Sequence, residues 1–270
     1  MMTSPIQKRR AESELNVFRQ FRMSETRDIF FVTERAVQEC AKTVAFATVY
    51  KGNEEYWVDS SGKADPTPDL FSKEYETMIE IMRVDDHAFE IEDGKIINHS
   101  LAADSKRFNE LVKSGILDQY PDAQIMVTSN TGLPTLEDHN YLRYKTNFKR
   151  VVFDHISKIP TYRKNHPECR YLTFLIFDES SGYFEFSEPP KELKRGVVYR
   201  GRPHLWFIDE EFIDVFRGSD IDCVIWYAPY KYAESRFLPE VLPSVSVYFK
   251  NETISDIRKY DENRVLPAEE

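Results

Sequence analysis

The residue types best suited to chemistry are two carboxylates, one within an apolar run and one shortly before it. Asp69 follows Pro68, and Glu80 lies within the run 78–86, Met-Ile-Glu-Ile-Met-Arg-Val-Asp-Asp. A carboxylate in apolar surroundings is unfavourable unless it is paired, hydrogen-bonded or bound to a cation. The run therefore either lies half exposed at a sheet edge or holds acids that bind a metal.

A strand over residues 77–84 would bring these two acids together. Side chains alternate along a strand, so Glu80 would share a face with Met82. Asp69 lies just upstream, on backbone that two prolines hold extended. Two carboxylates that converge at a sheet edge suit a hard cation, Mg²⁺ or Mn²⁺. Such a cation could polarise a phosphodiester and lower the pKa of an attacking water.

The same residues also fit a helix. Asp is a favoured N-cap, so Asp69 could begin a helix at Leu70. Glu80 would then lie on a solvated face, and Arg83 could pair with Glu76 or Glu80 at helical spacing. The two alternatives differ in whether Asp69 precedes a strand or caps a helix.

Three further positions allow both a structural and a chemical interpretation. Asp-Asp-His at 85–87 predicts a turn that ends the strand, or a transition-metal ligand set. Asp178-Glu179 follows an apolar run and predicts a turn, or a site at the carboxyl end of a strand that replaces or completes the Asp69 site. His155 lies at the margin of a helical apolar stripe, as a hydrogen-bonded core histidine or a catalytic base.

Apolar periodicity outlines the elements that must position these residues. Helical spacing is found at 28–42, 102–112, 142–159 and 209–216. Pro160 is expected to end the third of these helices. Runs of β-forming residues predict strands at 44–50, 55–58, 77–84, 122–128, 171–177, 183–186, 205–208, 223–227 and 244–249. Alternating helices and buried strands predict an α/β or α+β fold with a mixed central sheet flanked by helices.

The chain of 270 residues divides into one domain with polar ends. We expect an N-terminal extension over 1–25, an α/β domain over 26–250 with an irregular insertion near 98–140, and a polar tail over 251–270. Three cysteines without paired spacing predict neither disulfides nor a zinc cluster, and so a reduced, cytoplasmic setting. No apolar run is long enough to span a membrane, so we expect no membrane partner.

With these elements in order, the sequence resembles the PD-(D/E)XK nuclease superfamily. The core of that family is a helix, three strands, a helix and a strand, with Pro-Asp at one strand and Glu-x-Lys on the next. The resemblance implies a restriction-endonuclease-like core with Asp69 and Glu80 as metal ligands, and Glu34 or Glu39 as a third acid. It covers roughly the 150 residues from the first predicted helix to strand 171–177, with a long insertion.

The family lysine is replaced in this chain. Met82 stands at its position, and a thioether can neither orient a water nor stabilise developing charge. A migrated lysine would be Lys73, Lys145 or Lys149, and we assign Lys149 to this role as a third catalytic residue beside Asp69 and Glu80.

The formal net charge of −10 opposes nucleic-acid binding unless bases gather locally. Two basic strips could supply such contacts, or could be solvated surface. Their candidate residues are Lys145, Arg150, Lys194, Arg195, Arg200 and Arg202.

These observations favour a metal-dependent nuclease or phosphodiesterase that acts on nucleic acid. A P-loop, a dinucleotide-binding glycine motif, a nucleophile elbow and a zinc-protease motif are all missing from the sequence, which argues against those enzyme classes. The alternative is a non-catalytic binding or scaffold protein, whose protein partner or second copy would contact aromatic surface at Tyr227, Tyr230 and Tyr232.

Overall fold

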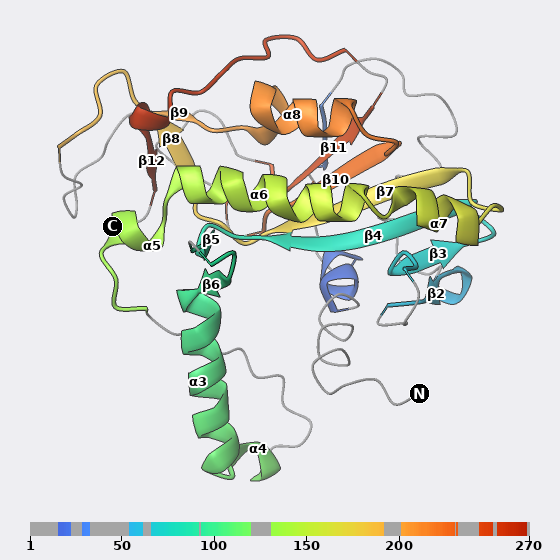
Figure 1. The fold of residues 1–270 in the computed structure, drawn as a ribbon, viewed down its shortest axis with the longest axis horizontal. Coiled ribbons are helices and arrows are strands. Elements are labelled where there is room, and N and C mark those ends of the chain that lie inside the picture. The colour runs from blue at the N-terminus through green and yellow to red at the C-terminus, as the bar shows by residue number, and fades with distance from the viewer. Residues whose placement is uncertain are drawn as a thin grey trace.

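The fold is built on a mixed sheet with helices on both of its faces. The computed structural model describes residues 16–22, 29–32, 54–61, 66–91, 93–119, 131–191, 201–229, 231, 243–250 and 253–268. Within this part of the chain the main sheet has seven strands (Figure 1). In spatial order they are β1 (Ile29–Phe31), β11 (Val245–Phe249), β10 (Cys223–Tyr227), β7 (Tyr171–Asp178), β4 (Thr77–Val84), β3 (Leu70–Ser72) and β2 (Val58–Asp59).

Three parallel strands form the centre of this sheet. β4 pairs with β7, and β7 pairs with β10, all in parallel. Each is a nearly continuous apolar run that is buried on both faces, as is typical of parallel strands. The outer strands β11 and β3 are antiparallel to their central neighbours. The predicted strands at 77–84, 171–177, 223–227 and 244–249 are therefore confirmed.

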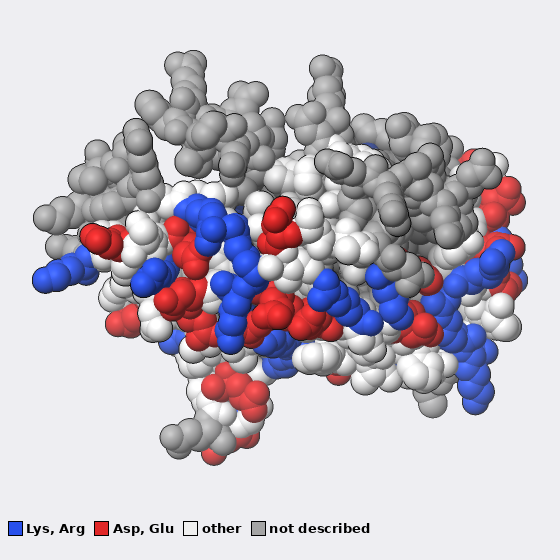
Figure 2. Space-filling view, turned by 90° about the horizontal axis from the view of Figure 1, so that it is seen from above, with Lys and Arg blue, Asp and Glu red and all other residues white. Residues whose placement is uncertain are grey.

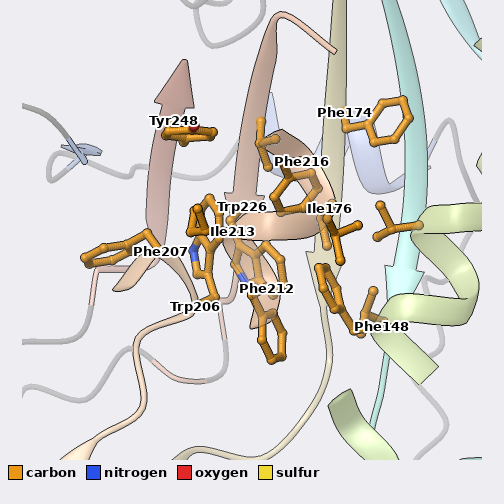
Figure 3. Packing of buried hydrophobic residues seen from close by; sticks show 14 of the residues in the cluster. Phe148, Phe174, Ile176, Trp206, Phe207, Phe212, Ile213, Phe216, Trp226 and Tyr248 are labelled. Carbon is orange, nitrogen blue, oxygen red and sulfur yellow. The ribbon is translucent and has the colours of Figure 1, made fainter. Parts of the chain in front are cut away.

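Two helices cover one face of the sheet. They are α6 (Tyr141–Ile156) and α8 (Glu210–Arg217), and both were predicted from their apolar spacing. Phe148 of α6 stacks on Phe212 of α8 with ring centroids 4.2 Å apart. Beneath them, Trp206 stacks on Trp226 of β10 at 4.7 Å (Figure 3). This aromatic layer fixes both helices against the strands that carry the candidate acids.

The opposite face is covered by the helical residues 16–22 (Figure 1). Val17, Phe18 and Phe21 are buried against the other side of the central strands. The ring of Phe21 meets that of Tyr227 at 5.4 Å, so Tyr227 is a core residue and the prediction that it is surface aromatic was wrong. Tyr230 and Tyr232 lie outside the described residues.

The strand alternative for the acidic run is correct. Asp69 directly precedes β3, which turns back at residues 73–76 and pairs antiparallel with β4. Asp69 therefore caps no helix. Arg83 is directed to Glu179, with Nε 2.9 Å from Oε2, rather than to Glu76.

The N-terminal part of the sheet differs from the prediction. Ile29–Phe31 is an edge strand parallel to β11, although residues 28–42 were expected to be helical. Because this segment is only three residues long, its apolar residues fit the helical repeat and the strand repeat equally well. A 3₁₀ turn, η1 (Glu54–Tyr56), replaces the start of the expected strand 55–58, and β2 follows it. The expected strand 44–50, Glu34 and Glu39 lie outside the described residues.

Two further predictions, for residues 205–208 and for Pro160, differ from the structure. The aromatic segment at 205–208 forms a 3₁₀ turn, η2 (Trp206–Ile208), instead of a strand, because Asp209 caps α8 immediately after it. Pro160 does not end the helical region. It lies in the first turn of α7 (Ile159–Asn165), where a backbone N–H is not needed.

A small second sheet lies beside the main one. Its order is β12 (Val265–Pro267), β8 (Tyr183–Glu185) and β9 (Arg202–Pro203). The strand predicted at 183–186 therefore forms, but it pairs with the C-terminal strand instead of folding back on β7.

Both ends of the chain contribute to the packed structure. The sequence predicted polar extensions over 1–25 and 251–270. Instead, residues 16–22 pack on the sheet, and Tyr260 and Val265 are buried beside α8 and the second sheet. Among the described residues of each segment, apolar side chains such as Phe18 and Tyr260 are buried, and Arg22 is buried with them.

The insertion between β4 and α6 extends away from the sheet. It holds a hairpin of β5 (Ala88–Glu90) and β6 (Ile96–Asn98), then α3 (His99–Lys113), α4 (Ile116–Gln119) and α5 (Thr135–Asp138). α3 confirms the helix predicted at 102–112 and projects from the body (Figure 1). The predicted strand 122–128 lies outside the described residues. In the part of the chain that the structure describes, no helix has the length and apolarity that crossing a membrane requires.

Candidate functional site

Asp69 and Glu80 lie opposite one another where β3 begins. The β3–β4 register pairs Leu70 with Ile79, and its continuation by one residue sets Asp69 beside Glu80. Cross-strand neighbours of this kind point to the same face. Oδ2 of Asp69 accepts a hydrogen bond from the backbone N–H of Ile81 at 2.7 Å. Both acids are buried, with 8% and 4% of their surface exposed.

The two carboxylate oxygens of Glu80 have different surroundings. Oε1 accepts from the hydroxyl of Tyr162 at 2.8 Å and lies 2.5 Å from Nδ1 of His155. Oε2 is buried and has no hydrogen-bond partner among the described residues. A buried carboxylate oxygen in this state is unfavourable unless a cation or a water occupies the space before it. The donor set of the acidic pair therefore fits a hard divalent cation.

His155 and Tyr162 act as donors to this carboxylate. Burial, followed by the negative charge and hydrogen bond of Glu80, raises the pKa of Tyr162, so its hydroxyl keeps its proton. A carboxylate only accepts, so Nδ1 of His155 is the donor in its contact with Oε1. His155 is buried and hydrogen-bonded, as the first of its two interpretations predicted, and the same contact places it beside the candidate acids, as the second requires.

The predicted lysine is not brought to the acidic pair. Lys149 donates to Oε2 of Glu211 on α8 at 2.5 Å. Lys145 donates to the other oxygen of Glu211 and to Glu262. Lys73 is exposed, with its ammonium 3.9 Å from a carboxylate oxygen of Glu168. His155 is the basic side chain that contacts Glu80, on the helix where a migrated lysine was expected.

The predicted basic strips are largely paired with acids where they are described. Lys145 is buried between acidic side chains, so its assignment to an exposed nucleic-acid strip was wrong. Arg150 is exposed beside Asn147, and Arg202 pairs with Glu185. On the face shown in Figure 2, basic and acidic side chains are interspersed. Lys194, Arg195 and Arg200 lie outside the described residues.

Asp178 forms a separate buried site at the end of β7. Its Oδ2 accepts from Tyr144, Trp226 and Lys231 at 2.7–2.9 Å, and its Oδ1 accepts from Ser180. The register pairs Asp178 with Val84, which places it roughly 13 Å along the sheet from Glu80. The hypothesis that Asp178 replaces or completes the Asp69 site was therefore wrong.

A second possible metal centre lies just beyond β4. Among the described residues, one group of three or more His, Cys, Asp or Glu side chains brings its ligand atoms within 4.8 Å of one another: Asp86, His87 and His139. Burial alone would raise the pKa of Asp86, but hydrogen bonds from His139 and Tyr183 and the nearby imidazoles lower it below its ordinary value. Asp86 is thus held as a carboxylate.

Comparisons with known proteins leave the function to be judged from this geometry. The chain matches no protein-family model, and searches of curated proteins and of solved structures give no match.

Three residues of these sites were missed in the sequence. Tyr162 follows the proline that was expected to end a helix, and Asp138 and His139 fall in the least legible region of the chain. For Asp138 and His139, the sequence offered one indication: both residues directly precede the helix α6, which was predicted correctly. No sequence pattern indicated Tyr162.

Proposed function

We propose that this protein is a metal-dependent phosphodiesterase of the nuclease type, acting on nucleic acid. One observation carries the proposal. Asp69 and Glu80 face each other across β3 and β4, and Oε2 of Glu80 is buried without a hydrogen-bond partner in the described structure. This arrangement suits a divalent cation better than a purely structural pair of acids, because two adjacent buried carboxylates repel each other.

The order of the elements supports the resemblance to the PD-(D/E)XK superfamily. β2, β3 and β4 form an antiparallel series, α6 follows, and β7 returns parallel to β4. This is the three-strand, helix and strand part of that family's order. Pro68-Asp69 lies at the second of these strands and Glu80 on the third, as the family pattern requires. The order is carried by β2, β3 and β4 rather than by the strands expected at 44–50, 55–58 and 77–84, and Ile29–Phe31 is a strand where the first helix of the core was expected.

Each residue then has a defined role. Asp69 and Glu80 would hold Mg²⁺ or Mn²⁺, which when bound would polarise a phosphodiester and lower the pKa of a nearby water. Glu80 would use Oε2 for the cation, while Oε1 orients His155. His155 would replace the family lysine and accept, at Nε2, the proton that the attacking water loses.

Cleavage assays with purified full-length protein test this proposal. DNA and RNA substrates are incubated with Mg²⁺ or Mn²⁺ and, separately, with a chelator. We expect cation-dependent cleavage that is lost in Asp69→Asn and Glu80→Gln. Glu179→Gln is the matched control, because Glu179 directly follows β7 and pairs with Arg83, away from the Asp69–Glu80 pair. Absence of cleavage by the wild type, or equal cleavage by all variants, would refute the enzymatic proposal.

A second candidate function is a non-catalytic binding protein on the same fold. It is favoured by Met82, which is buried beside Glu80, and by the burial of the site. Asp69, Glu80, His155 and Tyr162 are each at most 8% exposed within the described structure. For this candidate, the wild type would bind nucleic acid or a protein partner without cleaving nucleic acid. Met82→Lys, which returns the family lysine, would be the variant with which to restore cleavage.

The cysteines support the proposed cytoplasmic setting. Cys169 and Cys223 are both buried free thiols. Burial raises the pKa of the Cys169 thiol to about 11, which makes it unreactive at neutral pH. Free buried thiols of this kind are common where the environment is reducing.

A further inference from the structure

We propose that Asp86, His87 and His139 form a binding site for a divalent transition metal of the Zn²⁺ type. The site is separate from the Asp69–Glu80 pair and does not depend on the proposed phosphodiesterase function. Asp86 lies two residues beyond the end of β4, and the strand from Glu80 to Val84 alone spans roughly 13 Å.

The ligand atoms of the three side chains all lie within 4.8 Å of one another, and the two separations from Asp86 are close to those around a bound zinc ion. Nε2 of His87 lies 3.6 Å from Oδ1 of Asp86, and Nδ1 of His139 lies 3.1 Å from Oδ2 of Asp86. In a tetrahedral site with bonds of about 2.0–2.2 Å, neighbouring ligand atoms are about 3.4 Å apart. The three side chains therefore need only small movements to surround one ion.

Asp86 presents an oxygen for which the described protein offers no hydrogen bond. Its side chain is fully buried. Oδ2 accepts from the backbone N–H of Ser181 at 3.0 Å and from the hydroxyl of Tyr183 at 2.6 Å, and it faces Nδ1 of His139. Oδ1 has no hydrogen-bond partner in the described residues and faces the His87 imidazole. A metal ion at this point would satisfy the buried oxygen.

Asp138 orients one of the histidine ligands. Its Oδ1 lies 3.1 Å from Nδ1 of His87, and its Oδ2 accepts from Thr131 at 2.8 Å. The contact to Nδ1 holds the proton on that nitrogen and directs Nε2, with its lone pair, toward Asp86. Carboxylates that bind the outer nitrogen of a ligating histidine are a regular feature of zinc sites.

The donor set selects the class of metal. Two imidazoles and one carboxylate suit Zn²⁺, Fe²⁺ or Ni²⁺, whereas Mg²⁺ and Ca²⁺ prefer oxygen ligands alone. Three protein ligands leave one position of a tetrahedral ion for a water. His87 and His139 are 16% and 14% exposed, so solvent reaches the edge of the site.

The site joins three segments of the chain. Asp86 and His87 follow β4, His139 links α5 to α6, and the Ser181 and Tyr183 donors belong to the segment that enters β8. A bound ion would therefore fasten the returning end of the long insertion to the carboxyl end of the central sheet. It would stabilise the folded state, because the unfolded chain does not hold these ligands together.

The test uses untagged full-length protein and ZnCl₂. Metal content after dialysis and gel filtration, titration calorimetry and thermal unfolding are measured for the wild type and for His87→Gln, His139→Gln, Asp138→Asn and His99→Gln. We expect the wild type to retain one equivalent of Zn²⁺ and to unfold at a higher temperature with the metal. Asp138→Asn should weaken binding by about 10–100-fold, and loss of either ligating histidine should weaken it further.

Two controls separate this site from other metal binding. His99→Gln alters a solvent-exposed histidine of α3 and should leave binding unchanged. His155→Gln alters the histidine beside Glu80 and should also leave it unchanged. Co²⁺ in place of Zn²⁺ should give tetrahedral d–d absorption in the wild type that His139→Gln lacks. The proposal would be overturned if the wild-type protein retained no Zn²⁺, or if His87→Gln and His139→Gln bound Zn²⁺ as tightly as the wild type.

Discussion

His155 of α6 contacts the Glu80 carboxylate of β4 across 2.5 Å, although the two residues lie 75 positions apart in the sequence. In the proposed site, this imidazole would take the role that the lysine has in the nuclease pattern. The same carboxylate also binds Tyr162 of α7, so two consecutive helices are connected to one buried acid.

The first prediction concerns the role of His155. Replacement by Gln should reduce cation-dependent cleavage by on the order of 100-fold, because general acid–base groups contribute about 10²–10⁴-fold. Affinity for Mn²⁺ should stay close to that of the wild type, since Asp69 and Glu80 remain. Addition of imidazole should restore part of the rate. If His155 had a purely structural role, the variant would instead have a lower free energy of unfolding, and imidazole would not restore its cleavage rate.

The second prediction concerns the Tyr162 hydroxyl. Tyr162→Phe removes one of two donors to a buried carboxylate and should lower the free energy of unfolding by about 1.5–3 kcal/mol. Urea unfolding measures the change. Tyr56→Phe is the control, because Tyr56 is exposed, and it should change stability by less than about 0.5 kcal/mol. Equal stability of the two variants would mean that the Glu80 hydrogen bond is not formed in solution.

The third prediction concerns the buried ion pair at the end of β7. Lys231→Met removes the cation that contacts Asp178, and it should destabilise the protein by about 3 kcal/mol, at the low end for a broken buried pair. The loss is limited because Tyr144, Trp226 and Ser180 still donate to Asp178. Lys158→Met, which breaks a surface pair with Asp154, should change stability by less than about 1 kcal/mol. Similar effects of the two substitutions would argue against the buried pair.

The fourth prediction concerns pH. His204 is buried, and burial lowers its pKa below the ordinary value of about 6.5, although its hydrogen bond to Asp209 opposes this. Burial would raise the pKa of Asp209, but the His204 contact and the Tyr141 hydroxyl lower it on balance. Neutral His204 therefore donates to ionised Asp209 over 2.9 Å in the folded protein.

The sign of the pH dependence follows from these directions. Below about pH 6.5 the unfolded chain binds a proton at His204 that the folded protein does not, so stability falls as the pH falls. A further loss follows as the pH falls below the ordinary pKa of Asp209, about 3.9, toward its lower folded value. Urea unfolding between about pH 8 and pH 5 measures the first loss. His204→Gln should make the stability less dependent on pH by up to about 1.4 kcal/mol per pH unit, and an unchanged slope would contradict the assignment.

Elements with a long, regular pattern could be predicted from the sequence. The apolar runs of β7 and β10 and the amphipathic stripe of α6 each carry enough residues to distinguish a strand from a helix. The acid-containing run of β4 fitted both, and the structure decided for the strand. Short segments could not be assigned in this way. Ile29–Phe31 fits both periods, and Trp206–Ile208 has strand composition but is set by the cap of the next helix.

The sites could be predicted only in part, because their residues meet through the fold. Asp69 and Glu80 lie close in sequence, and one antiparallel register was enough to bring them together. His155, by contrast, is brought to Glu80 by the packing of α6 on β4, which no local pattern contains. His139 reaches Asp86 across the whole insertion, over 53 positions.

The pairing of β1 with β11 has a consequence for synthesis on the ribosome. β1 is made first, but its parallel partner emerges roughly 200 residues later. Until then the backbone N–H and C=O groups of β1 have no strand to pair with in the sheet, whereas β4, α6 and β7 can already assemble. The N-terminal strand is therefore expected to dock late, as a closing step, because contacts of large sequence separation form slowly. A chain truncated before residue 245 would lack the partner of β1 and expose the edge of β10 to pairing with other molecules.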